Sequence, residues 1–271
     1  MRNNLDTYIS YLREQELAEE TIKIYIRHAI IIDAYLEKFG LSKQVVLKYK
    51  KRLMNKKLAP ATLNLAIISV NKYLKYCGYG DYVVKTQKIQ NRKSLENVIS
   101  IMEYKKMLVT AKTNKKMKYY YIMKTLAQTG IRISELRYFT VEILEKKKVI
   151  INNKGKIREI YLPDSLVSEL EVYCEIAGIK NGAIFRGNTE KPIGRASVYK
   201  MLLRIGKDAG VPKEKIYPHS FRHLFAVTYM NSYGNLTELA DILGHSNLET
   251  TRIYTLSTAE EKRKRMDNLG L

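Results

Sequence analysis

Three polar signals lie within the last third of the chain, between Tyr217 and Tyr254, in an otherwise apolar and helical pattern. The first is an H-x-x-R from His219 to Arg222, the second is the Gly-His at 244–245, and the third is Tyr254 itself. Residues three apart share one face of a helix, so His219 and Arg222 can address one anion together. A tyrosine can act as a nucleophile, but its ordinary pKa near 10 means that it needs a base. These residue types suit chemistry on an anionic substrate.

Two basic residues upstream complete the set, because Arg132 lies in TGIRISEL and Lys154 lies in NNKGKIREIYLP. The order H-x-x-R, then L-G-H-S, then T-T-x-I-Y resembles the C-terminal half of the tyrosine recombinase (phage integrase) family. Arg132 and Lys154 fall where this family has its remaining catalytic residues. Each signal alone is weak, but five spaced signals in family order are specific. The resemblance covers nearly all of the chain.

The resemblance implies a transesterification on a DNA phosphodiester. It implies a covalent 3′-phosphotyrosyl link and a free 5′ hydroxyl, with no ATP, metal or other cofactor. An arginine suits the charge neutralisation, because its planar fork donates two hydrogen bonds to phosphate and stays charged. The implied roles are the following: Arg132 and Arg222 clamp the phosphate, Tyr254 attacks, His219 accepts its proton, His245 donates a hydrogen bond to the phosphate, and Lys154 protonates the departing 5′ oxygen.

Some of these residues have other interpretations. Lys156 competes with Lys154 for the general-acid role, and Lys154 is favoured because it precedes the glycine as in the family. Arg132 could form an ordinary surface salt bridge with Glu135. Alternatively, Glu135 positions a catalytic residue without contacting the substrate itself, since the family often has an acid there. His223, next to Arg222, is expected to be structural.

Composition favours a nucleic-acid partner. The chain of 271 residues carries a formal net charge of +21, with a pI near 9.7. Such a charge on a folded chain points first to nucleic acid and second to an anionic membrane, although a merely lysine-rich surface is the plainer alternative.

No apolar stretch approaches the length of a membrane-spanning helix, and no signal-peptide core is seen. The histidines lack metal-ligand spacing, which disfavours a zinc- or magnesium-dependent nuclease. We expect a cytoplasmic, nucleoid-associated bacterial protein.

Residues 1–85 predict four amphipathic helices, with a stop at Gly40, a cap at Ser42 and a first-turn Pro60. This layout resembles the family's helical, SAM-like core-binding domain. Residues 86–97 are polar and basic without periodicity, and they predict a linker. A solvated helix face is the ordinary alternative for the charge run on the third helix. The expected DNA contacts are Lys48, Lys51, Arg52, Lys56 and Lys57, together with Lys156 in the second domain.

Residues 98–271 predict a mainly helical catalytic domain. Helices are expected at about 104–111, 117–129, 131–139, 164–177, 197–209, 220–232 and 236–243, with a short one at Tyr254. The β-rich runs at 149–151 and 160–162 predict a hairpin with lysines at its tip. A capping-box pattern begins at Thr258, so a last helix is expected at about 258–269. It is too short to be stable alone in water and must dock.

The fold class expected is therefore mainly α with a small β-hairpin, in a two-domain DNA clamp. The expected function is that of a site-specific DNA recombinase acting on double-stranded DNA. The alternatives are strand nicking and closing like that of a type IB topoisomerase, and a catalytically silent DNA-binding protein. The resemblance implies a homo-tetramer on two DNA sites that exchanges its C-terminal tails. Accessory DNA-bending proteins are possible partners, and a membrane is not expected to be one.

Overall fold

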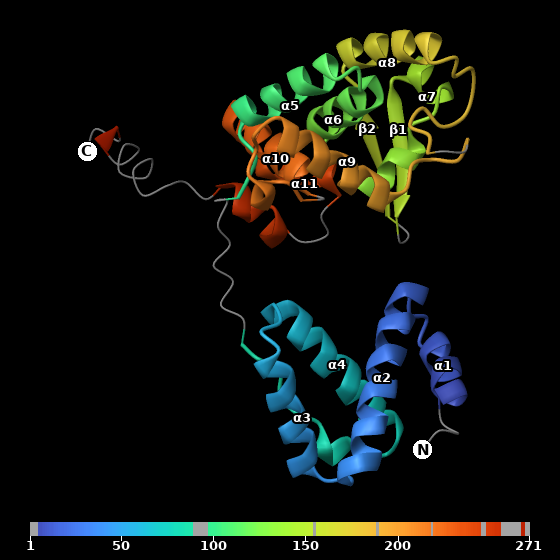
Figure 1. Cartoon of the computed structure of the whole chain (residues 1–271), viewed down its shortest axis with the longest axis vertical. Coiled ribbons are helices and arrows are strands. Elements are labelled where there is room, and N and C mark those ends of the chain that lie inside the picture. The colour runs from blue at the N-terminus through green and yellow to red at the C-terminus, as the bar shows by residue number, and fades with distance from the viewer. Residues whose placement is uncertain are drawn as a thin grey trace. The chain divides into compact units, whose positions relative to one another are not determined.

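The computed structural model describes residues 5–88, 97–153, 156–187, 190–217, 219–244, 248–255 and 267–268 (Figure 1). These residues are mainly helical and contain one antiparallel two-stranded sheet. The predicted fold class is therefore confirmed. Chain contacts divide the protein into two compact units, residues 1–92 and 93–271. Lys154, His245 and nearly all of the predicted helix at 258–269 lie outside the described residues.

Four α-helices and a short 3₁₀-helix make up the described part of the first unit. Their bounds are α1 Leu5–Glu14, α2 Glu19–Phe39, α3 Lys43–Asn55, α4 Pro60–Tyr76 and η2 Gly80–Tyr82. The predicted cap at Ser42 is present, because its side chain accepts a hydrogen bond from the Val45 amide. Pro60 opens α4, where its missing N–H costs nothing. The four helices bury one apolar core, in which Tyr8 packs edge-on against Tyr73.

The second unit holds the remaining elements. Their bounds are α5 Ile101–Thr113, α6 Met117–Thr129, η3 Ile133–Tyr138, α7 Glu142–Lys146, β1 Lys148–Asn153, β2 Lys156–Tyr161, α8 Asp164–Ile176, α9 Arg195–Asp208, η4 Lys213–Lys215, α10 Ser220–Tyr233, α11 Leu236–Leu243, η5 Leu248–Thr250 and η6 Arg252–Thr255. Helix α5 begins three residues before its predicted start, because Ser100 and Glu103 form a capping box. The short helix α7 was not predicted.

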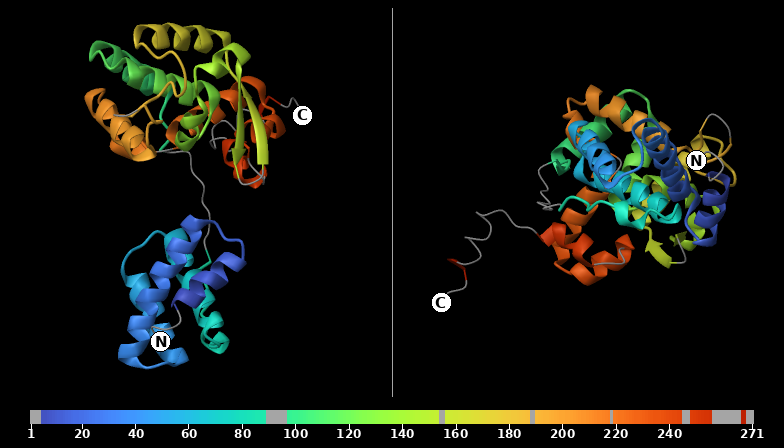
Figure 2. Two further views of the ribbon diagram at one scale, coloured as in Figure 1. Left: turned by 90° about the vertical axis from the view of Figure 1, so that its right-hand side faces the viewer. Right: turned by 90° about the horizontal axis from the view of Figure 1, so that it is seen from below.

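The predicted hairpin is present as β1 and β2, which lie side by side in Figure 2. Val149 pairs with Ile160, and Ile151 pairs with Arg158. Because side chains alternate along a strand, these four residues share one face of the hairpin. Val149, Ile151 and Ile160 are buried on that face. Arg158 therefore lies on the same face of the hairpin as these apolar residues.

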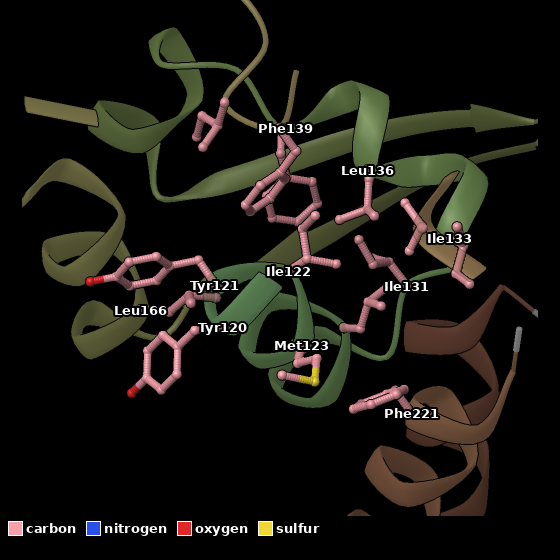
Figure 3. Packing of buried hydrophobic residues seen from close by; sticks show 14 of the residues in the cluster. Tyr120, Tyr121, Ile122, Met123, Ile131, Ile133, Leu136, Phe139, Leu166 and Phe221 are labelled. Atoms are coloured by element: carbon pink, nitrogen blue, oxygen red, sulfur yellow. The ribbon is translucent and has the colours of Figure 1, made fainter. Parts of the chain in front are cut away.

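Helix α6 lies at the centre of the second core (Figure 3). Ile122 and Met123 of α6 are fully buried, and α6 packs against α5, α8 and α10. Phe221 attaches α10 to this core and meets Tyr104 of α5 edge-on. The packing of α10 matters for the site, because His219 and Arg222 of the H-x-x-R motif lie at its start.

One local prediction was wrong. Arg132 was expected in the first turn of a helix over 131–139, but its backbone is extended and it precedes the 3₁₀-helix η3. The reason is Gly130, which ends α6 in the left-handed conformation with φ 63°. The chain then turns within three residues, and the Glu135 side chain accepts the Arg132 amide proton at 2.7 Å. This contact caps η3 and starts it at Ile133.

Candidate active site

Arg222 lies at the centre of the site and is 4% exposed. Its Nη1 donates to the carbonyl of Gly130 at 2.8 Å, and its Nη2 donates to the carbonyl of Leu243 at 2.5 Å. These carbonyls stand at the C-terminal ends of α6 and α11, where the helix dipole concentrates negative charge. Two helix ends therefore orient the guanidinium group of Arg222 and compensate part of its buried charge.

Arg132 forms an ion pair with Glu135, whose side chain is more deeply buried than that of Arg132. Glu135 is 2% exposed and accepts from Nη1 of Arg132 at 3.0 Å, while the side chain of Arg132 keeps 27% of its surface. The alternative pairing of Arg132 with Glu135 is therefore present, but it is a largely buried ion pair and not a surface one. Since Glu135 bonds both the backbone amide and the guanidinium of Arg132, it sets the position of that side chain from inside the protein.

Arg158 belongs to the same cluster, and sequence reasoning missed it. Its Nη2 lies 2.5 Å from Oε2 of Glu135, and its Nη1 donates to the carbonyl of Leu243. Its side chain is only 10% exposed. The available signal was its position two residues before Ile160, which puts an arginine on the apolar face of a strand. A charged group buried on that face needs a partner of opposite charge, and Glu135 is that partner.

Tyr254 lies in η6, which packs on α10, and it is 8% exposed. Its hydroxyl lies 2.6 Å from Nδ1 of His223. Tyr217 approaches the same imidazole, with ring centroids 5.7 Å apart. Burial raises the pKa of Tyr254 to about 12, although the charge of Arg222 lowers it in part. The phenol is therefore protonated at rest and bonded to His223, for which the sequence predicts a structural role.

His219 occupies the N-cap position of α10 and retains exposed surface. Partial desolvation of the imidazole lowers the pKa of His219, and the positive charges of Arg222, Arg132 and Arg195 lower it further. His219 is thus held among positive groups. A neutral imidazole in this position can donate a hydrogen bond to an anion that those groups attract.

The electrostatics of the cluster favour an anionic ligand. Three guanidinium groups, those of Arg132, Arg158 and Arg222, surround the single carboxylate of Glu135. Burial lowers the pKa of Arg222, and the charges of Arg132 and Arg158 lower it further than Glu135 raises it. The neighbouring carboxylate therefore leaves positive charge uncompensated. A phosphate with two non-bridging oxygens would supply the missing negative charge.

The structure thus brings together Arg132, Glu135, His219, Arg222 and Tyr254 of the predicted set. Lys154 and His245 are outside the described residues, and the side chain of Lys156 at the start of β2 is not described. Gly244 precedes His245 in the left-handed conformation, and its Cα is so close to Arg158 that an added Cβ would lie 2.5 Å from Nη1. Gly244, the residue before His245, therefore lies directly against Arg158.

The five basic residues predicted on α3 and at its exit are all exposed. They are Lys48, Lys51, Arg52, Lys56 and Lys57. Arg52 lies over the ring of Tyr35, 5.9 Å from its centroid. Arg52 and Lys56 also line a groove between α2 and α3 together with Tyr35, Phe39 and Tyr49.

Two further findings concern the described part of the chain only. Its His, Cys, Asp and Glu side chains form no group of three that could hold a metal ion. None of its helices combines the length and the apolar character that crossing a membrane requires.

A buried phenol lies beside a cluster of guanidinium groups on a mainly helical unit, and this arrangement suits attack on a phosphate by tyrosine. The sequence profile of the phage integrase family matches residues 97–261, which contain this whole site. The chain is also 25% identical to tyrosine recombinase XerA of Pyrococcus furiosus, over 98% of this chain and 94% of the relative. Tyrosine recombinase XerD of Listeria innocua is 24% identical, over 94% of each chain.

A solved structure shares the fold. The Tn1549 transposon integrase, determined in complex with transposon right end DNA, aligns with a TM-score of 0.74. The alignment covers 98% of this chain and 99% of that one, at 19% identity. The chain therefore belongs to the phage integrase family, as a tyrosine recombinase of the Xer-like type. The resemblance inferred from the sequence motifs is confirmed.

Proposed function

We propose that the protein is a site-specific recombinase that cuts and rejoins double-stranded DNA through a 3′-phosphotyrosyl intermediate on Tyr254. The observation that supports this best is the position of the Tyr254 hydroxyl. It is hydrogen-bonded to a histidine and coupled to the charge of Arg222, which belongs to a cluster with surplus positive charge. The phosphate and its attacker can therefore meet in one place.

The roles of the individual residues follow from the chemistry. Arg132 and Arg222 would neutralise the non-bridging oxygens, with Glu135 and Arg158 positioning Arg132. His219 would contact the same phosphate. The family resemblance adds His245 as a further hydrogen-bond donor and Lys154 as the acid for the 5′ oxygen, with Lys156 as the alternative. No ATP is needed, because the phosphotyrosyl link conserves the energy of the broken bond.

Covalent capture tests this proposal. Fragmented genomic DNA from the source organism, nicked at random, is incubated with the full-length protein, and covalently bound fragments are recovered and sequenced. We expect a discrete set of sites, attached through a 3′ phosphate to Tyr254. Tyr254→Phe should bind the recovered duplex without forming an adduct. The matched control is Tyr233→Phe, which changes a 73% exposed tyrosine on α10 and should keep full adduct formation. An adduct on another tyrosine would refute the assignment.

We further propose that residues 1–85 form a core-binding domain joined to the catalytic domain by residues 86–97. The exposed basic residues of α3 support DNA contact by this domain. So does the Tn1549 transposon integrase, which was solved with DNA and aligns over 98% of this chain. A protein starting near Asn97 should then lose most of its affinity for the recovered duplex. Equal affinity of the truncated and full-length proteins would contradict this role.

We propose a homo-tetramer on two DNA sites, assembled by exchange of the tail at about 258–269. The support is the capping-box pattern and the family resemblance. Deleting residues 258–271 should keep binding to one site and abolish pairing of two sites, as measured by gel-shift stoichiometry. If the shortened protein still pairs sites and recombines at the full rate, the tail is not an exchange element. A nucleoid-associated, cytoplasmic location and DNA-bending accessory proteins remain part of this proposal.

A further inference from the structure

We propose that His223, and not His219, accepts the proton of Tyr254 when the phenol attacks the phosphate. This inference rests on the proposed function, because it assigns the proton transfer within the same reaction. Nδ1 of His223 lies 2.6 Å from the Tyr254 oxygen, which is a short hydrogen bond between the two side chains. The contact to Tyr254 that the described residues show comes from His223, although the family resemblance predicts His219 for this task.

The helix α10 explains how the two histidines take different tasks. His223 follows Arg222 directly, and successive residues of a helix point about 100° apart. Arg222 therefore reaches the ends of α6 and α11, while His223 faces η6 and Tyr254. His219 stands one turn earlier, at the exposed N-cap among Arg132, Arg195 and Arg222. That position suits a contact to the phosphate, whereas the position of His223 suits a contact to the nucleophile.

The protonation state of His223 fits an acceptor. Burial lowers its pKa to about 4, and the nearby His219 and Arg222 contribute to this shift. The groups that face the ring are Tyr254 from η6, Tyr217 before α10, and His219 and Arg222 of α10 itself. At neutral pH the imidazole is therefore uncharged. It accepts the phenol proton at Nδ1 in the tautomer that carries its own hydrogen on Nε2.

The pKa values of His223 and Tyr254 are far apart, so the phenol keeps its proton while the site is empty. Two changes favour transfer when DNA is bound. The anionic phosphate raises the pKa of the imidazole, because an opposite charge stabilises the protonated form. The Tyr254 oxygen also loses its basicity as it bonds to phosphorus. The proton consequently moves during the attack and not before it, which is general-base catalysis.

The bond between the Tyr254 oxygen and phosphorus forms as the bond between phosphorus and the 5′ oxygen breaks. The phenol proton passes to Nδ1 of His223, and the general acid gives a proton to the 5′ oxygen. In rejoining, the 5′ hydroxyl attacks phosphorus and gives its proton back to the general acid, while the Tyr254 oxygen departs and takes the proton that His223 holds. His223 is therefore needed twice, each time at the tyrosine.

The first experiment compares cleavage by wild type and His223→Asn on the duplex recovered by covalent capture. The asparagine keeps a hydrogen-bond acceptor near the position of Nδ1 but cannot take a proton at neutral pH. We expect unchanged duplex affinity and an adduct rate lower by about 10²- to 10⁴-fold, the usual contribution of a general base. The matched control is His28→Asn, a half-buried histidine of α2 in the first unit, which should cleave at the wild-type rate.

The second experiment separates proton transfer from structural support. A duplex whose 3′ end carries a 4-nitrophenyl phosphate is joined to a 5′-hydroxyl strand by proteins that lack the nucleophile. Nitrophenolate departs without protonation, so the joining step needs the arginine cluster but not His223. We expect Tyr254→Phe and the double variant Tyr254→Phe/His223→Asn to join this substrate at rates within about threefold of each other.

The outcomes decide the inference. Wild-type cleavage by His223→Asn would overturn it, and so would an equal loss of cleavage and of nitrophenyl joining, because that pattern marks a structural role. Absence of any adduct with the wild-type protein would instead refute the proposed function. A slow His219→Asn variant does not distinguish the two histidines by rate alone. It should, however, also slow nitrophenyl joining in the Tyr254→Phe background, because His219 acts on the phosphate.

Discussion

Glu135 and Arg158 form a buried ion pair across 23 residues of sequence, with 2.5 Å between Oε2 and Nη2. The pair links η3, which follows Arg132, to strand β2 of the hairpin. Arg158 also donates to the carbonyl of Leu243, so it reaches the end of α11 as well. One side chain thus holds together the three segments that lead to Arg132, to the hairpin tip and to the loop with His245. We therefore expect substitutions in this ion pair to reduce both stability and activity.

Removing one member of this pair should destabilise the second unit strongly. We expect Arg158→Met to lower the free energy of unfolding by about 3 kcal/mol, because it leaves a buried carboxylate with one fewer partner. Glu135→Gln should also be destabilising, and the double variant should lose less than the sum of the single ones. Urea unfolding followed by circular dichroism measures these values. Additive effects of the two substitutions would show that the pair is not coupled.

Gly244→Ala should cost more than Gly234→Ala, although both glycines end helices in the left-handed conformation. The φ angles are nearly equal, at +63° and +67°, so the backbone penalty of about 1–2 kcal/mol is shared. At Gly234 an added Cβ meets nothing within 4 Å, whereas at Gly244 it would meet Nη1 of Arg158 at 2.5 Å. Cleavage of the captured duplex should therefore fall only in Gly244→Ala. Equal effects on stability and cleavage would contradict the contact.

The stability of the second unit should fall as the pH drops from about 6.5 to about 4. His223 has a folded-state pKa of about 4 against an ordinary value of 6.5. Between these values the unfolded chain binds a proton that the folded protein does not, so acid favours unfolding. Above 6.5 neither state binds the proton, and the contribution is constant. His223→Asn should reduce the difference in unfolding free energy between pH 7 and pH 5, as measured in urea. An unchanged difference would contradict the buried, neutral state of His223.

Cleavage should persist in excess EDTA. In the proposed mechanism the guanidinium groups of Arg132 and Arg222 neutralise the phosphate, so that task needs no metal. Adduct formation on the captured duplex, with and without EDTA, measures this directly. Loss of cleavage in EDTA together with its return on adding magnesium would show that the proposed mechanism is wrong.

Lys51→Gln should weaken DNA binding more than Lys23→Gln. Lys51 is exposed on α3, whereas Lys23 is already paired with Glu20 at 2.7 Å. A lysine that contacts phosphate releases a counterion, and its loss should reduce the slope of log affinity against log salt by about 0.9. Fluorescence anisotropy on the captured duplex at several salt concentrations gives the slope. An equal slope for both variants and the wild type would show that Lys51 does not contact DNA.

The fold class, the family, most of the helices and the hairpin could be predicted from the amino-acid sequence. These features depend on local signals: the cap at Ser42, the proline at 60, the glycines after helices, and the apolar periodicity between them. The family followed from the order of the motifs around Arg132, Arg222 and Tyr254. Such signals are readable because each acts within a few residues of chain. The missed start of α5 at its capping box shows that even a local signal can be overlooked.

The contacts between distant groups in the site could not be predicted in this way. Arg158 and the carbonyl of Leu243 are 85 residues apart, and no local pattern could pair them. The choice between His219 and His223 as partner of Tyr254 was likewise not local, because both lie at the start of α10 within one turn of each other. It depends on which turn of α10 lies against η6, because residues four apart share one face of a helix. That packing is set by long-range burial of apolar surface, which brings Tyr254 to His223 at 2.6 Å.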